Sequence, residues 1–299
     1  MRQVAAIRHR GRRRRDCVES HPGFYRRRGE SHGADEQSAR AGGMPERDTR
    51  TARSSIRDRI ADHRKPALAP GGKLGTTFAT MTYSLIGRCA LTGQLGCAVA
   101  TSSLSVGSRV PYAEAGVGAV LTQHRTDPRL GPRGLALLRQ GCSAEEALAA
   151  LVASTPHHGW RQLAVMDRLG RTAQFDGAKV KPARAAVHAE DCVAMGNILA
   201  NEQVPAAMAA AFAGSAAEPL AERLVRAMEA GEAAGGEGRP VISSALLVVE
   251  RKVFPLVDLR VDDAPEAILA LRTLWDRYRP MVELFVTRAV DPDATPAPV

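Results

Sequence analysis

The chain has 299 residues, of which 41 are lysine or arginine, 32 are aspartate or glutamate, and 44% are hydrophobic. No apolar run reaches the roughly 20 residues that a membrane-spanning helix needs, so the sequence predicts no contact with a membrane. The five cysteines form no CxxC pair and have no regular spacing, which favours reduced thiols in a cytoplasmic protein over a disulfide framework.

The net charge of +9 is unevenly distributed along the chain. Residues 1–80 hold 19 basic and 9 acidic residues, whereas residues 81–299 carry a net charge of −1. The first segment combines arginine runs with low hydrophobicity, so we expect a disordered leader, and we interpret it as translated upstream sequence with the true start at Met81. A nucleic-acid-binding arm and a targeting segment are the alternatives for this leader. For the folded domain we expect no nucleic-acid partner.

The remainder predicts one folded domain, 81–290, followed by a loose tail, 291–299. Alternating or continuous apolar runs between turn signals predict strands, and 3.6-residue periodicity with caps predicts helices. The predicted strands are 83–88, 95–101, 115–123, 162–167, 171–175, 192–199, 242–250 and 257–261. The predicted helices are 132–140, 143–153, 203–213, 216–234 and 265–279.

Hairpins dominate this order of elements, which indicates antiparallel pairing. Helices that come in groups between strands are typical of the α+β class, in which they cover the outer faces of the sheets. Two mainly antiparallel sheets packed face to face, with helices outside, is therefore the expected architecture.

Common catalytic and cofactor motifs are absent: there is no GxxxxGK[ST], GxGxxG, HExxH or GxSxG. The histidines of the domain are scattered without metal-ligand spacing, so we expect no metal and no cofactor. His124 is expected to be a satisfied histidine rather than a catalyst, and Trp160 and Trp275 to be packing residues. No cluster of Arg or Lys in residues 81–299 indicates a phosphate or an acidic ligand.

Thr82, which follows Met81, is the candidate nucleophile. Methionine before a small residue such as threonine is routinely removed in the cytosol. The threonine would then have a free α-amine with a pKa near 7.7–8.0, close to ambient pH. Such an amine can take the proton of the hydroxyl group, and the oxygen can then attack a carbonyl carbon.

The sequence from Thr82 resembles a known bacterial family, the "domain of unknown function 1028" family. The resemblance rests on MTYSLIGRCALTGQLGCAVATSS, AEAGVGAVLTQ, DPRLGPRGLALL, SAEEALAALVASTPHHGWRQLAVMDRLGRTAQFDGAK, CVAMGNILAN, SSALLVVE and VDLRVDD, in this order. It implies the N-terminal nucleophile (Ntn) hydrolase superfamily and its four-layer αββα sandwich. It also implies a chain that starts at the Met-Thr pair, and it names no substrate.

Further site residues are proposed beside Thr82. Asn197 ends a strand and is the best side-chain candidate for an oxyanion donor, or else only a turn asparagine. Ser102 and Ser103 follow the second strand, near where superfamily enzymes keep groups that tune the nucleophile. They could instead cap a turn. This chain has no Lys or Arg there, unlike some relatives.

Four more residues are candidates for substrate binding. Thr122 and Gln123 end a buried strand, while Asp258 and Arg260 alternate with apolar neighbours and are more readily explained as a structural ion pair. The predicted function is an amidohydrolase that cleaves an amide, lactam or carbamoyl bond of a small molecule. The alternative is a non-catalytic module for binding or assembly. A homodimer is the default expectation for the assembly.

Overall fold

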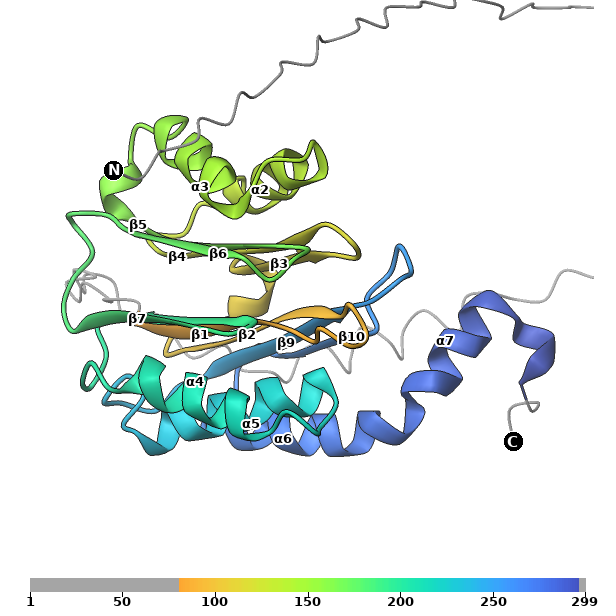
Figure 1. Cartoon of the computed structure of the whole chain (residues 1–299). Helices are drawn as coiled ribbons and strands as arrows, with labels where there is room; N and C mark the ends of the chain where they lie inside the picture. The colour runs from red at the N-terminus through yellow and green to blue at the C-terminus, as the bar shows by residue number, and fades with distance from the viewer. Residues whose placement is uncertain (1–80, 296–299) are drawn as a thin grey trace, which may run out of the picture. The chain divides into compact units, whose positions relative to one another are not determined.

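The computed structural model describes residues 81–295, and the predicted leader and residues 296–299 lie outside this range. Two antiparallel sheets form the centre of the domain (Figure 1). The six-stranded sheet has the spatial order β10 (Val257–Val261), β9 (Ser243–Val249), β2 (Leu95–Thr101), β1 (Thr82–Arg88), β8 (Cys192–Asn197) and β7 (Arg184–Ala189). The four-stranded sheet has the order β3 (Pro111–Glu114), β4 (Gly118–His124), β5 (Arg161–Asp167) and β6 (Thr172–Asp176).

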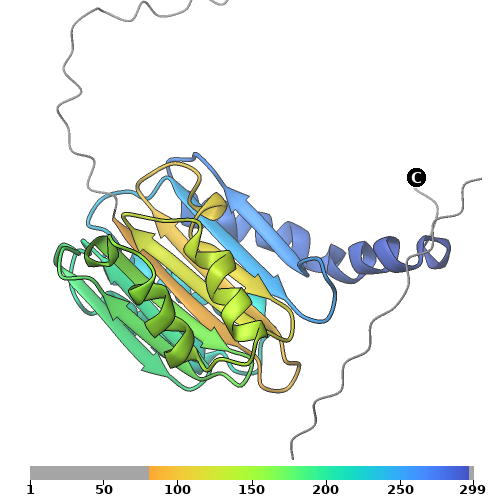
Figure 2. The same ribbon diagram turned by 90° about the horizontal axis from the view of Figure 1, so that it is seen from above.

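The helices lie on the outer faces of the two sheets (Figures 1 and 2). The four-stranded sheet is covered by α2 (Leu130–Arg139) and α3 (Ala144–Ala153), and the six-stranded sheet by α4 (Val204–Gly214), α5 (Leu220–Ala233) and α6 (Ala267–Tyr278). The last helix, α7 (Val282–Val290), extends beyond the sheets in both views. The predicted α+β class with two antiparallel sheets is thus confirmed.

Local signals explain why these elements begin and end where they do. Ser143 and Glu146 form the reciprocal capping box expected from the sequence, with the Glu146 amide donating to Ser143 Oγ at 3.2 Å and the Ser143 amide to Glu146 Oε2 at 2.8 Å. The strands β3 and β7, which the sequence pattern did not predict, are both edge strands and only partly buried. An edge strand that is only partly buried needs little alternation of apolar and polar residues, so its sequence pattern predicts a strand only weakly.

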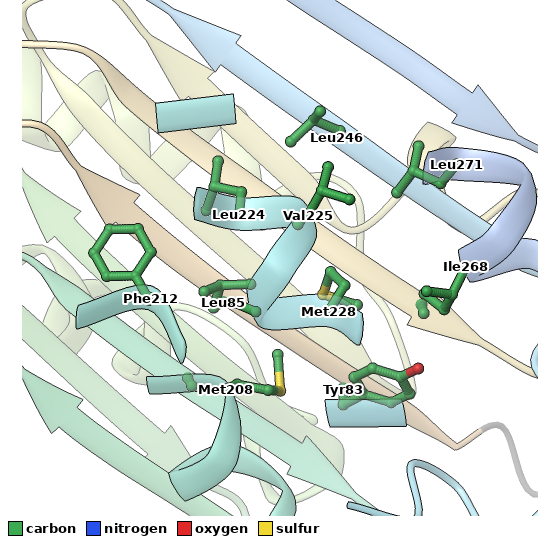
Figure 3. Packing of buried hydrophobic residues seen from close by; sticks show 14 of the residues in the cluster. Tyr83, Leu85, Met208, Phe212, Leu224, Val225, Met228, Leu246, Ile268 and Leu271 are labelled. Carbon is green, nitrogen blue, oxygen red and sulfur yellow. The ribbon is translucent and has the colours of Figure 1, made fainter. Parts of the chain in front are cut away.

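Within residues 81–295, three apolar clusters hold the layers together. The largest fills the space between the six-stranded sheet and α4 to α6, and Figure 3 shows Tyr83 and Leu85 of β1 packed there against Met208, Phe212 and Met228. A second cluster lies between the two sheets, and a third lies between the four-stranded sheet and its two helices. Each layer therefore buries its apolar face against the next.

The two-residue repeat of β1 determines where Thr82 points. Tyr83 and Leu85 belong to the helix-side cluster, whereas Ile86 belongs to the cluster between the sheets. Successive side chains of a strand alternate between faces, so Thr82 and Ser84 face the second sheet together with Ile86.

Candidate active site

Thr82 begins β1 and is 4% exposed. Its backbone lies opposite Asn197 of β8 in the antiparallel register. Its Oγ1 donates a hydrogen bond of 2.6 Å to the carbonyl oxygen of Met81, and the hydroxyl of Thr101 donates to the same oxygen. A carbonyl oxygen lies within about 2.3 Å of the nitrogen of its own peptide bond. The Thr101 hydroxyl therefore lies close to the peptide group that joins Met81 to Thr82.

A buried polar network connects the two sheets beside Thr82. Ser84 Oγ donates to Gln123 Oε1 at 2.7 Å, and Gln123 Nε2 donates to Gln162 Oε1 at 2.6 Å. Asn197 Nδ2 donates to the same Gln162 oxygen at 2.9 Å, while Gln162 Nε2 donates to the carbonyl of Gly196 at 2.9 Å. This hydrogen-bonded network fixes the relative position of strands from both sheets. At the end of the sandwich where Thr82 lies, these polar side chains occupy the space between the two sheets.

A cleft of about 480 Å³ opens at this end, between the two sheets. It is formed by the start of β1, the end of β2, the loop before β3, the end of β4 and the start of β5. Its lining residues are Thr82, Thr101, Ser103, Val106, Arg109, Val110, His124, Arg125, Thr126 and Arg161. The volume is in the range typical of small-molecule sites.

The lining of the cleft is strongly basic. Three arginines far apart in the sequence, Arg109, Arg125 and Arg161, meet there, and no aspartate or glutamate is among the described lining residues. The sequence did not indicate this cluster, because the three arginines stand apart along the chain. The topology produces the cluster, because β4 and β5 pair in a register that sets His124 opposite Arg161.

His124 contributes to this wall through an unusual backbone conformation. Its φ of 67° ends the regular alternation of β4 and lies in the left-handed region, which few non-glycine residues adopt. Its Nδ1 is 2.9 Å from the carbonyl oxygen of Trp160, and its ring stacks on the Trp160 ring. Burial lowers the pKa of His124, and the charges of Arg125 and Arg161 act in the same direction. The hydrogen bond to the Trp160 carbonyl opposes this shift in pKa without reversing it.

Glu237 lies behind Thr101, on the side of the six-stranded sheet. It is 3% exposed, and its Oε2 accepts a hydrogen bond of 2.9 Å from the amide of Ser102. Burial raises the pKa of Glu237 to about 7, although contacts from Ser102, Arg239 and Thr101 oppose this shift. A buried carboxyl group with a raised pKa, next to the Thr101 that lines the cleft, is a typical feature of a functional site.

The buried Glu237 is expected to reduce stability as the pH rises. A carboxyl whose folded pKa is about 7, against an ordinary value of 4.5, holds its proton longer in the folded state, so stability falls between these two pH values. We expect Glu237→Gln to raise the free energy of unfolding by on the order of 2 kcal/mol at pH 8 and to change it little at pH 4. Urea unfolding at both pH values measures this difference. Glu202→Gln, at an exposed position, is the control, and equal gains for both variants would contradict the assignment.

Of the two serines predicted as site residues after the second strand, one lines the cleft and the other does not. Ser103 lines the cleft, and its Oγ accepts a hydrogen bond from Arg109. Ser102 contributes its backbone amide to Glu237. Arg109 also supplies a basic group near the place where the sequence lacks one. Asn197 is fully buried beside Thr82, with Nδ2 bound to Gln162 and Oδ1 without a partner. Its role as an oxyanion donor stays a prediction.

The other predicted substrate-binding residues are not among the described residues that line the cleft. Gln123 is buried in the inter-sheet network. Thr122 alternates to the opposite face of β4, where its Oγ1 is 3.4 Å from the carbonyl of Asp127. Asp258 and Arg260 form an exposed ion pair of 3.4 Å on the edge strand β10. This placement fits the structural ion pair that the sequence favoured.

The described residues contain neither a candidate metal site nor a candidate membrane span. Within 81–295, no group of three or more His, Cys, Asp or Glu side chains is arranged to hold a metal ion. No helix of the same range is long and apolar enough to cross a membrane.

Comparison with known proteins identifies the family. The pattern of the family of unknown function DUF1028 matches residues 82–271, so the chain belongs to this family. A crystal structure from Silicibacter pomeroyi, of a protein assigned to DUF1028, matches with a TM-score of 0.62 and 32% identity, over 66% of this chain and 89% of that one. The Anbu (ancestral beta-subunit) protein of Yersinia bercovieri matches with a TM-score of 0.34 and 10% identity, over 73% of this chain and 99% of that one. None of the curated proteins matches the chain.

Proposed function

We propose that the protein is an amidohydrolase of the N-terminal nucleophile type, with Thr82 as the nucleophile after removal of Met81. The observation that carries this proposal is the position of Thr82, the first residue of a central strand, with its side chain in the inter-sheet cleft. The family pattern also begins at Thr82. The order of helix, sheet, sheet and helix layers agrees with the αββα sandwich that we propose for this fold.

The reaction would proceed through an ester on Thr82. The free α-amine takes the proton of Oγ1, and the oxygen attacks the carbonyl carbon of the amide. The resulting α-ammonium gives this proton to the leaving nitrogen, which departs as the free amine when the C–N bond breaks. Water then hydrolyses the ester with the same amine as base and releases the acid. Thr101 hydrogen-bonds to the Met81 carbonyl, so its hydroxyl is close to the Thr82 nitrogen that becomes the free α-amine when Met81 is removed. Asn197, beside Thr82, is the candidate donor to the oxyanion.

The chain terminus decides whether this mechanism is possible. We expect intact-mass measurement and N-terminal sequencing of the protein from its native cells to give a chain that starts at Thr82. We also expect a β-lactone, a strained ester that acylates nucleophilic hydroxyl groups, to add one equivalent of its mass to Thr82. A mature chain that retains Met81 would overturn the mechanism and leave the non-catalytic binding or assembly module as the better interpretation.

A further inference from the structure

We propose that the three cleft arginines, Arg109, Arg125 and Arg161, bind an anionic group of the substrate, a carboxylate or a phosphate. This inference rests on the proposed function and adds the substrate class, which is a small amide that carries negative charge. Guanidinium groups bind both kinds of anion through paired hydrogen bonds. The same cleft contains Thr82, so the anionic group and the scissile bond would belong to one small molecule.

Arg109 is a half-buried cation without a carboxylate partner among the described residues. Its guanidinium donates to the carbonyl oxygens of Leu104 and Ser105 and to Ser103 Oγ, which are all neutral acceptors. These bonds hold the group against the cleft wall without neutralising its charge. Burial lowers the pKa of Arg109, with no acidic group opposing the shift. A bound anion would supply the missing countercharge.

Arg161 is only partly neutralised. Its side chain is 11% exposed, and its Nη2 is 3.6 Å from Asp127 Oδ2, which is too long for a good hydrogen bond. The Asp127 carboxylate is already occupied by Arg129, whose Nε and Nη2 donate to its two oxygens at 2.9 and 2.8 Å. The Nε atom of Arg161 is buried and makes no hydrogen bond. One carboxylate therefore serves two arginines, and an excess positive charge remains at the cleft.

Arg125 completes the wall from the exposed side. Its guanidinium lies 5.1 Å from the centre of the Trp160 ring, and Lys179 lies 5.3 Å from the same ring. Trp160 therefore does more than pack, because its ring contacts the guanidinium of Arg125, a residue of the cleft lining. Arg125 makes no ion pair among the described residues, so its charge is available to a ligand.

Calorimetric titration of the full chain tests the proposal with three small probes. Succinate and methyl phosphate carry the two candidate anionic groups, whereas succinamide has the size of succinate without its charge. We expect at least one anion to bind about tenfold or more tightly than succinamide. The preferred anion identifies the group that the substrate carries.

Variants assign the binding to the cleft rather than to the arginine-rich leader. Arg125→Gln is expected to weaken anion binding about tenfold. Arg109→Lys keeps the positive charge but loses the paired donors of the guanidinium, so it should weaken binding by a smaller factor. Arg288→Gln removes the same charge from the exposed surface of α7 and should leave binding unchanged. Equal affinities for the anions and succinamide, or equal losses for Arg125→Gln and Arg288→Gln, would overturn the proposal.

Thr82→Ala separates this inference from the proposed function. The variant should bind the preferred anion as tightly as the unmodified protein, because the arginines do not contact the Thr82 hydroxyl in the hydrogen bonds of the cleft. Binding that survives in a protein whose mature N-terminus is not Thr82 would support the anion site and reject the chemistry. If Arg125→Gln loses β-lactone labelling but binds the anion as before, the arginines are not the anion-binding groups.

Discussion

Thr82→Ala is expected to reduce acylation by a β-lactone, and the hydrolysis of any amide substrate, by on the order of 10³-fold or more. Removal of a catalytic nucleophile has effects of this size because the remaining groups only bind and polarise the substrate. The fold should persist. Among described residues the Thr82 hydroxyl bonds only to the Met81 carbonyl, a bond that is lost when Met81 is removed, and β1 is held by its backbone ladders to β2 and β8. The expected loss of stability is therefore below about 1 kcal/mol.

Thr82→Ser is the matched control for the Thr82 prediction. It keeps the hydroxyl and the α-amine and removes only a methyl group, so acylation should continue at a reduced rate. Intact mass against time gives the acylation rate, and thermal unfolding followed by circular dichroism confirms that each variant is folded. If Thr82→Ala acquires the β-lactone mass as fast as the unmodified protein, Thr82 is not the nucleophile.

Most of the fold could be predicted from the sequence because its central elements carry strong local signals. The first hairpin, the capped helix at Ser143 and the apolar strand β9 are each specified by a few consecutive residues. The helix α7 was missed although its apolar residues recur at helical spacing, and none of its residues is buried. Fold class thus depends on patterns within short segments.

The chemical character of the cleft could not be predicted in the same way. Arg109, Arg125 and Arg161 come from three separate segments, and only the pairing of β4 with β5 and the packing of the two sheets bring them together. The end of β4 illustrates the difficulty. The sequence predicts Thr122 and Gln123 as site residues, whereas His124 and Arg125 line the cleft. The left-handed backbone of His124 changes the direction of the chain at this point. The nearest local signal was the run QHR after a buried strand.

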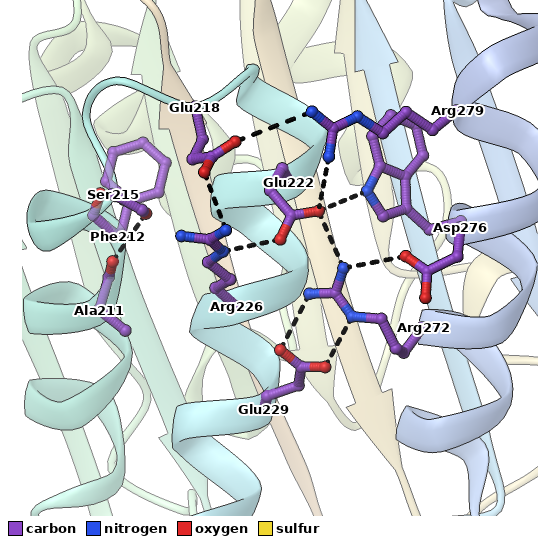
Figure 4. Close-up of polar contacts among 11 residues, drawn as sticks. Ala211, Phe212, Ser215, Glu218, Glu222, Arg226, Glu229, Arg272, Asp276 and Arg279 are labelled. Carbon is purple, nitrogen blue, oxygen red and sulfur yellow. Dashed lines mark hydrogen bonds and ion pairs between the residues drawn. The ribbon is translucent and has the colours of Figure 1, made fainter.

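Glu222→Ala is expected to reduce the free energy of unfolding by about 3 kcal/mol at pH 7. The Glu222 side chain is 5% exposed and lies between α5 and α6 (Figure 4). It accepts hydrogen bonds from Arg226 Nε at 2.7 Å and from Arg272 Nη1 at 2.8 Å. The indole Nε1 of Trp275 donates a third, at 2.7 Å. Removing one member of a buried charge network leaves the others unpaired, which costs about 3–5 kcal/mol. The lower end applies because Arg272 and Arg226 keep Glu229 and Glu218.

The pH dependence of stability provides a second check on Glu222. Burial alone would raise its pKa, but the hydrogen bonds from Arg272, Trp275 and Arg226 lower it to about 2. A depressed carboxyl pKa stabilises the folded state fully above the unfolded value of 4.5, and this contribution disappears as the pH falls toward 2. The stability difference between the unmodified protein and Glu222→Gln should therefore shrink over this range, as urea unfolding at pH 3 and pH 7 would measure. Glu283→Gln, at an exposed position of α7, is the control. A difference that stays constant from pH 7 to pH 3 would mean that the network stabilises the helix pair by packing rather than by charge.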